Sequence, residues 1–151
     1  MSDQVISIIP QKPFEKINRA TLKSAVKTLK SKLKADKISF FSQKTPRFVD
    51  CGQNFTNIKC PCCSASIGFG WWCDAMSVAS DLNFESLEII APCCHHRTAL
   101  NDLIYDYPCG FACCGITLLN PDISNEQSLI ELSLVVQSIL NIPTKVIKCR
   151  Q

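Results

Sequence analysis

The sequence predicts an α+β fold, in which an antiparallel sheet carries helices on one face and holds an inserted cysteine-rich module. Three observations predict it. A strand, helix, strand order precedes the cysteine-rich middle of the chain, the same order returns after it, and both helices are amphipathic. This is the split βαβ order, which packs its helices against one side of a sheet. We expect one α+β domain over residues 1–151, with the module, a zinc-knuckle insertion, at about residues 48–108.

The first half of the predicted sheet surrounds a basic helix. "VISIIP" at residues 5–10 is β-branched and ends in proline, which is typical of a buried strand. A helix is predicted over residues 13–35, because Pro13 suits a first turn and apolar residues recur at helical spacing. "KISFF" then predicts a strand, and "RFVDC" and "TNIKC" predict two shorter strands that lead to the first cysteines.

The same kinds of pattern predict the elements of the module and of the second half of the sheet. Apolar residues from Trp72 to Ala79 predict an amphipathic helix, and "SLEIIA" predicts a strand that feeds the second group of cysteines. "ACCGITLLNP" is apolar enough for a central strand. A long helix comes next, which Ser124 can cap together with Gln127. "TKVIKC" closes the sheet as a strand.

The cysteine content indicates reduced thiols. The chain has 11 cysteines among 151 residues, an odd number, so at least one stays unpaired in any disulfide scheme. The first residues lack the basic and apolar regions of a secretory signal, and we therefore expect a cytoplasmic protein. No run approaches the roughly 20 apolar residues that cross a bilayer. We expect no membrane span.

Two cysteine groups have the spacing of a metal site. Cys60 and Cys63 form a C-x-x-C pair with proline after the first cysteine, a turn that aims two thiolates at one ion. The second half of the site should come from the stretch that begins at Cys93, because the 29 residues between Cys63 and Cys93 contain a helix and a strand that can return the chain to the same place. Zinc is the expected ion, with iron as the competitor, because closed sulfur-rich sites favour both over magnesium or calcium. The predicted ligands are Cys60, Cys63, Cys93 and Cys94.

The fourth ligand has alternatives. "APCC" has the form of a C-P-x-C turn whose first cysteine is replaced by Ala91, so an adjacent residue must fill the gap. We assign Cys93, with His95 or His96 as the alternatives, and Cys62 as the spare thiol. The competing interpretation is that these thiols are buried as small hydrophobic side chains. That interpretation is preferred for the cysteines in or beside predicted core strands, which are Cys109, Cys113, Cys114 and Cys149.

The stretch from about residue 58 to residue 121 resembles a group of uncharacterised bacterial proteins. The shared features are a C-P-x-C turn, a tryptophan-containing helix, a P-C-C turn and a stretch that begins Leu100-Asn101-Asp102-Leu103. Tyr105, Pro108-x-Gly110-Phe111 and Asn120-Pro121 complete the match. The first turn is also similar to a zinc-ribbon knuckle, although Ser64 stands where such a knuckle usually has glycine. The resemblance implies a fold and a zinc site, and no activity.

A thiolate-rich site favours a structural role. A catalytic zinc keeps one position open for water, whereas this module offers more thiolates than one ion needs. The zinc deaminase pattern, H-x-E followed by P-C-x-x-C, is absent from the sequence. We therefore expect a non-catalytic module that uses a structural Zn²⁺ and binds a protein partner.

Two other functions remain open. Residues 1–50 hold eleven Lys and Arg residues against four Asp and Glu residues, a net charge of +7. Nucleic-acid binding would use the basic side of the first helix, and Trp71 could stack on a base. A cysteine-dependent enzyme would use Cys109 as nucleophile, with a histidine (His95 or His96) and an aspartate (Asp102 or Asp106). The basic residues of the helix are Lys16, Arg19, Lys23, Lys27, Lys30 and Lys34.

Overall fold

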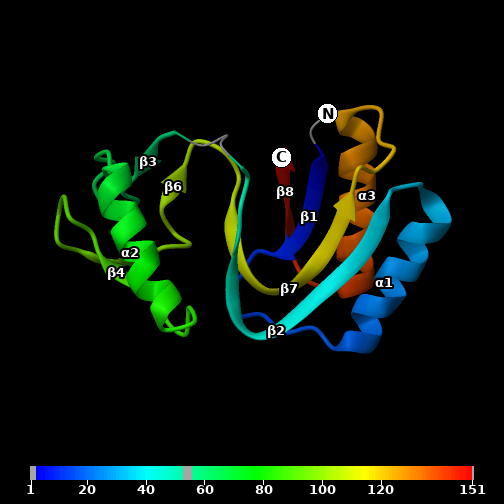
Figure 1. The fold of residues 1–151 in the computed structure, drawn as a ribbon, viewed down its shortest axis with the longest axis horizontal. Coiled ribbons are helices and arrows are strands. Elements are labelled where there is room, and N and C mark those ends of the chain that lie inside the picture. Colours follow the sequence, from blue (N-terminus) through cyan, green and yellow to red (C-terminus); the bar gives the residue numbers. More distant parts are fainter. Residues whose placement is uncertain (1–2, 53–55, 151) are drawn as a thin grey trace.

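A computed structural model describes residues 3–52 and 56–150 and confirms the α+β fold. Two helices, α1 and α3, lie side by side on one face of an antiparallel sheet, whose four strands follow the order β2-β7-β1-β8 (Figure 1). This is the order that a split βαβ unit produces. The strands are β1 (Gln4–Pro10), β2 (Lys37–Val49), β7 (Gly110–Leu119) and β8 (Thr144–Arg150), and the helices are α1 (Arg19–Lys32) and α3 (Glu126–Leu140).

Strand alternation separates the two faces of the sheet. Ile6 and Ile8 of β1 point toward the helices, where they join a core that includes Ile116 of β7. The helices contribute side chains that recur at helical spacing, as the sequence predicts. Leu22 and Leu29 of α1 are fully buried in this core.

Both helices begin later than the sequence predicts. α1 starts at Arg19 instead of Pro13, because the side chain of Asn18 accepts a hydrogen bond from the Thr21 N–H at 3.1 Å and caps the helix. α3 is capped by Asn125 and not by Ser124, with the Asn125 Oδ1 atom 2.8 Å from the Ser128 nitrogen. In both cases an asparagine provides the first cap.

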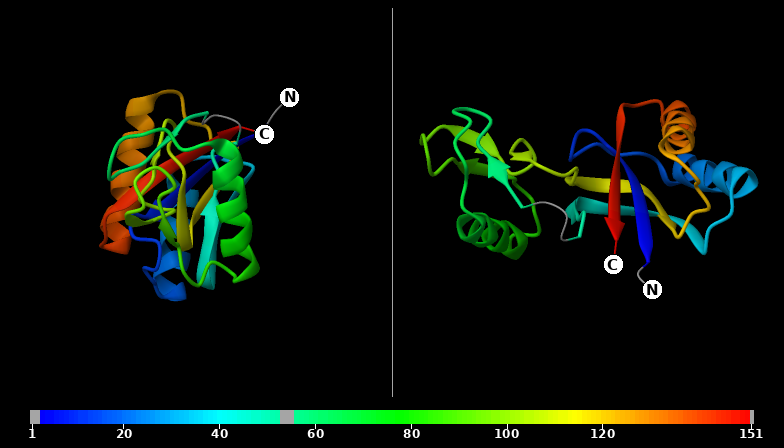
Figure 2. Two further views of the ribbon diagram at one scale, coloured as in Figure 1. Left: turned by 90° about the vertical axis from the view of Figure 1, so that its left-hand side faces the viewer. Right: turned by 90° about the horizontal axis from the view of Figure 1, so that it is seen from above.

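One long strand replaces two predicted short strands. "KISFF" and the first three residues of "RFVDC" both belong to β2, which pairs with β7 on either side of a register shift between Ser42 and Arg47. Such a bulge bends a strand without ending it. The bent ends of β2 and β7 extend toward the module, which lies at the opposite end of the molecule from α1 and α3 (Figures 1 and 2).

The module contains one helix and two small sheets. Strand β3 pairs with β6, and β4 pairs with β5. Its helix and the strands β3 and β4 agree with the predicted positions, whereas β5 and β6 have two or three residues each and were not predicted. The elements are β3 (Ile58–Lys59), α2 (Phe69–Asp81), β4 (Glu88–Ile90), β5 (Arg97–Ala99) and β6 (Ile104–Tyr105).

A second hydrophobic core joins the module to the sheet. Phe48 of β2 packs edge-on against Trp72 of α2, with ring centroids 5.7 Å apart. Trp72 donates a hydrogen bond from Nε1 to the Tyr105 hydroxyl at 3.0 Å, and that hydroxyl donates to the Leu100 carbonyl at 2.8 Å. Because buried donors need partners, this relay fixes α2 against the strands of the module.

None of the three helices in the described residues has the length and apolar character that spanning a bilayer requires.

Candidate metal centre

Two turns of the same geometry form the candidate site. In the first turn, the Cys60 N–H donates to the Ala65 carbonyl and the Ser64 N–H donates to the Cys60 carbonyl, each at 2.9 Å. In the second turn, the Ala91 N–H donates to His96 and the His95 N–H donates to Ala91, again at 2.9 Å. Ala91 therefore occupies in the second turn the position that Cys60 occupies in the first.

Each turn contains one residue with a positive φ, which is 65° at Ser64 and 61° at His95. Glycine adopts this left-handed conformation most easily, which explains why knuckle turns usually carry glycine at this point. His95 has the conformation of a turn residue, and its side chain is exposed. His95 is therefore the left-handed residue of the turn, directly after Cys94.

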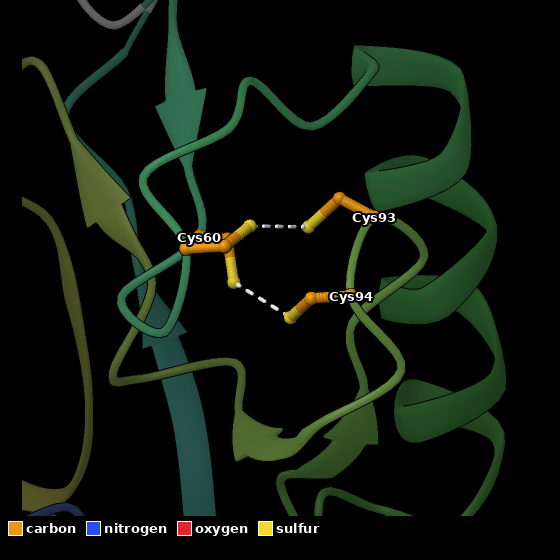
Figure 3. A group of neighbouring side chains, drawn as sticks. Cys60, Cys93 and Cys94 are labelled. Carbon is orange, nitrogen blue, oxygen red and sulfur yellow. Dashed lines mark hydrogen bonds between the residues drawn. The ribbon is translucent and has the colours of Figure 1, made fainter.

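The two turns bring four sulfur atoms together. The Sγ atoms of Cys60, Cys63, Cys93 and Cys94 all lie within 4.8 Å of one another. Cys60 Sγ is 3.8 Å from Cys94 Sγ, and Cys63 Sγ is 3.3 Å from Cys93 Sγ. Figure 3 shows Cys60 of the first turn facing Cys93 and Cys94 of the second. Four sulfurs at about 2.3 Å from one tetrahedral ion would lie about 3.8 Å apart, so the cluster could hold a metal ion.

The remaining candidates lie outside this cluster. His95 and His96 are exposed, and the ligand atoms that gather in the described residues are the four cysteine sulfurs. Cys62 is exposed as well, but its backbone N–H lies 3.3 Å from Cys60 Sγ and points at it. An N–H group aimed at a sulfur is the outer-shell contact that stabilises a bound thiolate.

The electrostatics of the cluster favour a cation. Burial raises the pKa of the Cys60 thiol, but hydrogen bonds from the Cys63 and Cys62 backbone and from the neighbouring thiols outweigh it and lower the pKa to about 6. Hydrogen bonding with Cys63, together with burial, raises the pKa of Cys93 to about 12. Hydrogen bonds among the thiols thus favour ionisation of Cys60 and oppose ionisation of Cys93, and a bound cation would favour the thiolate form of both. A metal that binds here would displace protons.

The proposed nucleophile Cys109 lies elsewhere. Its side chain is buried beside Cys51, and burial raises its pKa to about 12, so it holds its proton at neutral pH. Asp106, one of the two aspartates considered as its partner, is engaged elsewhere. Its carboxylate accepts hydrogen bonds from the Thr56 N–H and hydroxyl at 2.8 and 2.9 Å. Three further cysteines expected in the core, Cys113, Cys114 and Cys149, are buried.

The predicted nucleic-acid surface is divided by the fold. Lys23, Lys27 and Lys30 are exposed on α1, but Lys16 precedes the helix and its Nζ donates to the carbonyls of Gln43 and Lys44. Lys34, also exposed, follows the end of the helix. Arg19 covers the ring of Phe40, with its guanidinium carbon 5.1 Å from the ring centroid. Trp71, expected to point away from the core, is half-buried and packs against the core of the module.

No family model, no curated protein and no solved structure matches this chain. The site geometry is therefore the basis for a function.

Proposed function

We propose that Cys60, Cys63, Cys93 and Cys94 bind one structural zinc ion. The supporting observation is the convergence of four sulfurs from two turns at distances that suit a tetrahedral site. Zinc accepts an all-thiolate set at this spacing, and iron is the competing ion. Four protein ligands would fill the coordination sphere and leave no position for a reactive water.

The ion would stabilise the module by joining its two turns. Cys60 follows β3, and the second turn connects β4 to β5, so the ligands come from both small sheets. These sheets are two-stranded and two or three residues long, and such short pairs are not stable alone in water. Metal coordination would supply the missing stability, as it does in other small metal-bound modules.

Metal analysis of protein purified without added zinc tests this assignment. We expect one zinc ion per chain in the wild type. The same zinc content is expected in the controls Cys62→Ser and His96→Ala, because both side chains lie outside the cluster. Cys60→Ser, Cys63→Ser and Cys94→Ser should lose the metal, because each removes a ligand. Metal-free wild-type protein with ordinary stability would overturn the proposal, and iron in place of zinc would correct the ion.

We further propose that the module binds a protein partner through one side of α2. Val78 is 64% exposed, and Leu82, the C-cap residue that follows α2, is 63% exposed. The half-buried Trp71 lies on the side of the helix that carries Val78, seven residues before it, and Leu82 continues that spacing four residues after Val78. An exposed apolar stripe on a helix is typical of a surface that docks into a groove of another protein. A fixed module would present this stripe in one orientation.

Charge placed on the stripe should abolish partner binding. In affinity purification from cells, we expect a protein that is retained by the wild type and lost by Val78→Asp/Leu82→Asp. Ser77→Asp/Ser80→Asp is the matched control, because it adds the same charge on another exposed side of α2. The captured protein, once purified, should bind with the same dependence on these positions. If the wild type and both double variants retain the same partners with equal affinity, the stripe is not the interface.

A further inference from the structure

The face of the sheet opposite α1 and α3 carries a second candidate site. A cavity of about 380 Å³ lies on it, bounded by β1, β2 and β7 and by the segment that leaves β2 for the module. Apolar groups cover the helix-facing side of the same strands, whereas this cavity is lined by both polar and aromatic side chains. The polar side chains of this lining could bind a ligand.

Three hydroxyl groups form the floor of the cavity. Ser7 of β1 pairs with Thr117 of β7, and Thr117 pairs with Ser39 of β2, so the three residues form one row across adjacent strands. Ser7 is 8% exposed and is the buried polar residue of the described chain. The side chains of all three residues line the cavity. Hydroxyls that line a cavity in this way can bond to a ligand.

A stacked cation forms the wall of the cavity. The guanidinium carbon of Arg47 lies 3.5 Å from the centroid of the Phe41 ring. Gly115 allows this arrangement, because a Cβ atom there would lie 2.9 Å from Phe41 Cε1 and 2.8 Å from the side chain of Ile9. With one face on Phe41, the guanidinium keeps its other face for a planar ring and its in-plane N–H groups for an anion.

Arg47 is the cation in the lining of the cavity, and two further cations lie on its strand. β2 carries Lys37, Lys44 and Arg47 and no acidic residue between its ends. The ion pair found in the described residues is Lys148 with Glu126, so none of these three cations forms a direct ion pair there. Asp50 also lines the cavity, and its Oδ1 atom accepts a hydrogen bond from the Gly52 N–H at 2.9 Å, so the lining holds one positive and one negative side chain.

We propose that this cavity binds one nucleotide of a single-stranded RNA. The base stacks on the exposed face of Arg47, the row of hydroxyls bonds to base and ribose, and the guanidinium edge meets a phosphate. Lys37 and Lys44, on the same strand, neutralise flanking phosphates. The site is separate from the cysteine cluster, and it does not depend on the identity of the metal.

Fluorescence anisotropy with a labelled 12-nucleotide RNA of mixed sequence tests the site. We expect binding that weakens with salt, about tenfold weaker binding for Arg47→Gln, and weaker binding for Thr117→Val, which removes a hydroxyl at nearly constant shape. Lys27→Gln is the matched control, because it removes one exposed positive charge from α1 on the other side of the sheet. Metal content should not change, since Arg47 lies outside the cysteine cluster.

Four outcomes would overturn the proposal. The first is the absence of RNA binding at micromolar concentrations. The second is equal affinity of wild type and Arg47→Gln. The third is loss of binding in Lys27→Gln with full binding in Arg47→Gln, which would place RNA on α1. The fourth is full competition by a free mononucleotide at the affinity of the 12-mer, which would show that the cavity takes a small molecule.

Discussion

Cys60→Ser is expected to unfold the module while the four-stranded sheet remains folded. Cys60 is fully buried at the first turn, so its replacement removes both a metal ligand and a core side chain. Because metal-binding energy contributes directly to the folding of small metal sites, the loss should be large. The sheet has a separate core with α1 and α3, which contains none of the four cluster cysteines.

Hydrogen exchange followed by mass spectrometry separates these two parts of the chain. We expect amides of α2, β3 and β4 to lose at least about a hundredfold in protection, and amides of β1 and β7 to keep theirs. Chelation of the metal from the wild type should reproduce the pattern. Cys62→Ser is the control and should resemble the wild type. Unchanged protection of α2 in metal-free Cys60→Ser would show that the module folds without an ion.

Ala91→Cys is expected to rescue Cys93→Ser. Ala91 and Cys60 occupy equivalent positions in the two turns, with matching hydrogen bonds at 2.9 Å. A sulfur at position 91 would therefore approach the cluster from the second turn as Cys60 does from the first. Cys93→Ser alone should lower metal affinity by at least about a hundredfold, because loss of a direct ligand exceeds the effect of losing an outer-shell contact.

The double variant Ala91→Cys/Cys93→Ser should recover affinity to within about tenfold of the wild type, measured by competition with a chromogenic chelator. Ala91 is fully buried in the module core, so Ala91→Ser at the same position controls for the added volume. Ala91→Ser/Cys93→Ser should stay as weak as Cys93→Ser. Equal weakness of both double variants would contradict the equivalence of the two turns.

The fold class and the cysteine cluster could be predicted from sequence because both leave local patterns. The apolar spacing of α3 and the β-branched run before Pro10 identify their elements without knowledge of the rest of the chain. The C-x-x-C spacing likewise identifies Cys60 and Cys63 as a pair. Cys93 was harder to assign, because the sequence shows that Ala91 replaces a ligand but not whether Cys93, His95 or His96 reaches the cluster in its place.

Other features depend on contacts between distant residues. β5 and β6 are too short to carry a periodic pattern, and the start of α1 depends on Asn18, whose cap competes with the signal from Pro13. The row of hydroxyls on the open face brings together Ser7 and Thr117, which are far apart in the sequence and meet only through strand register. No local pattern could have revealed it.

The pairing of Val49 with Gly110 has a consequence for how far the length of the inserted segment can vary. These residues are Cα partners in the ladder of β2 and β7, and the whole module leaves and returns between them. The sheet therefore holds both ends of the inserted segment at a fixed short separation, whatever its length. Loop-closure entropy rises only slowly with length, so lineages could lengthen, shorten or exchange the inserted segment while the parent scaffold stayed intact.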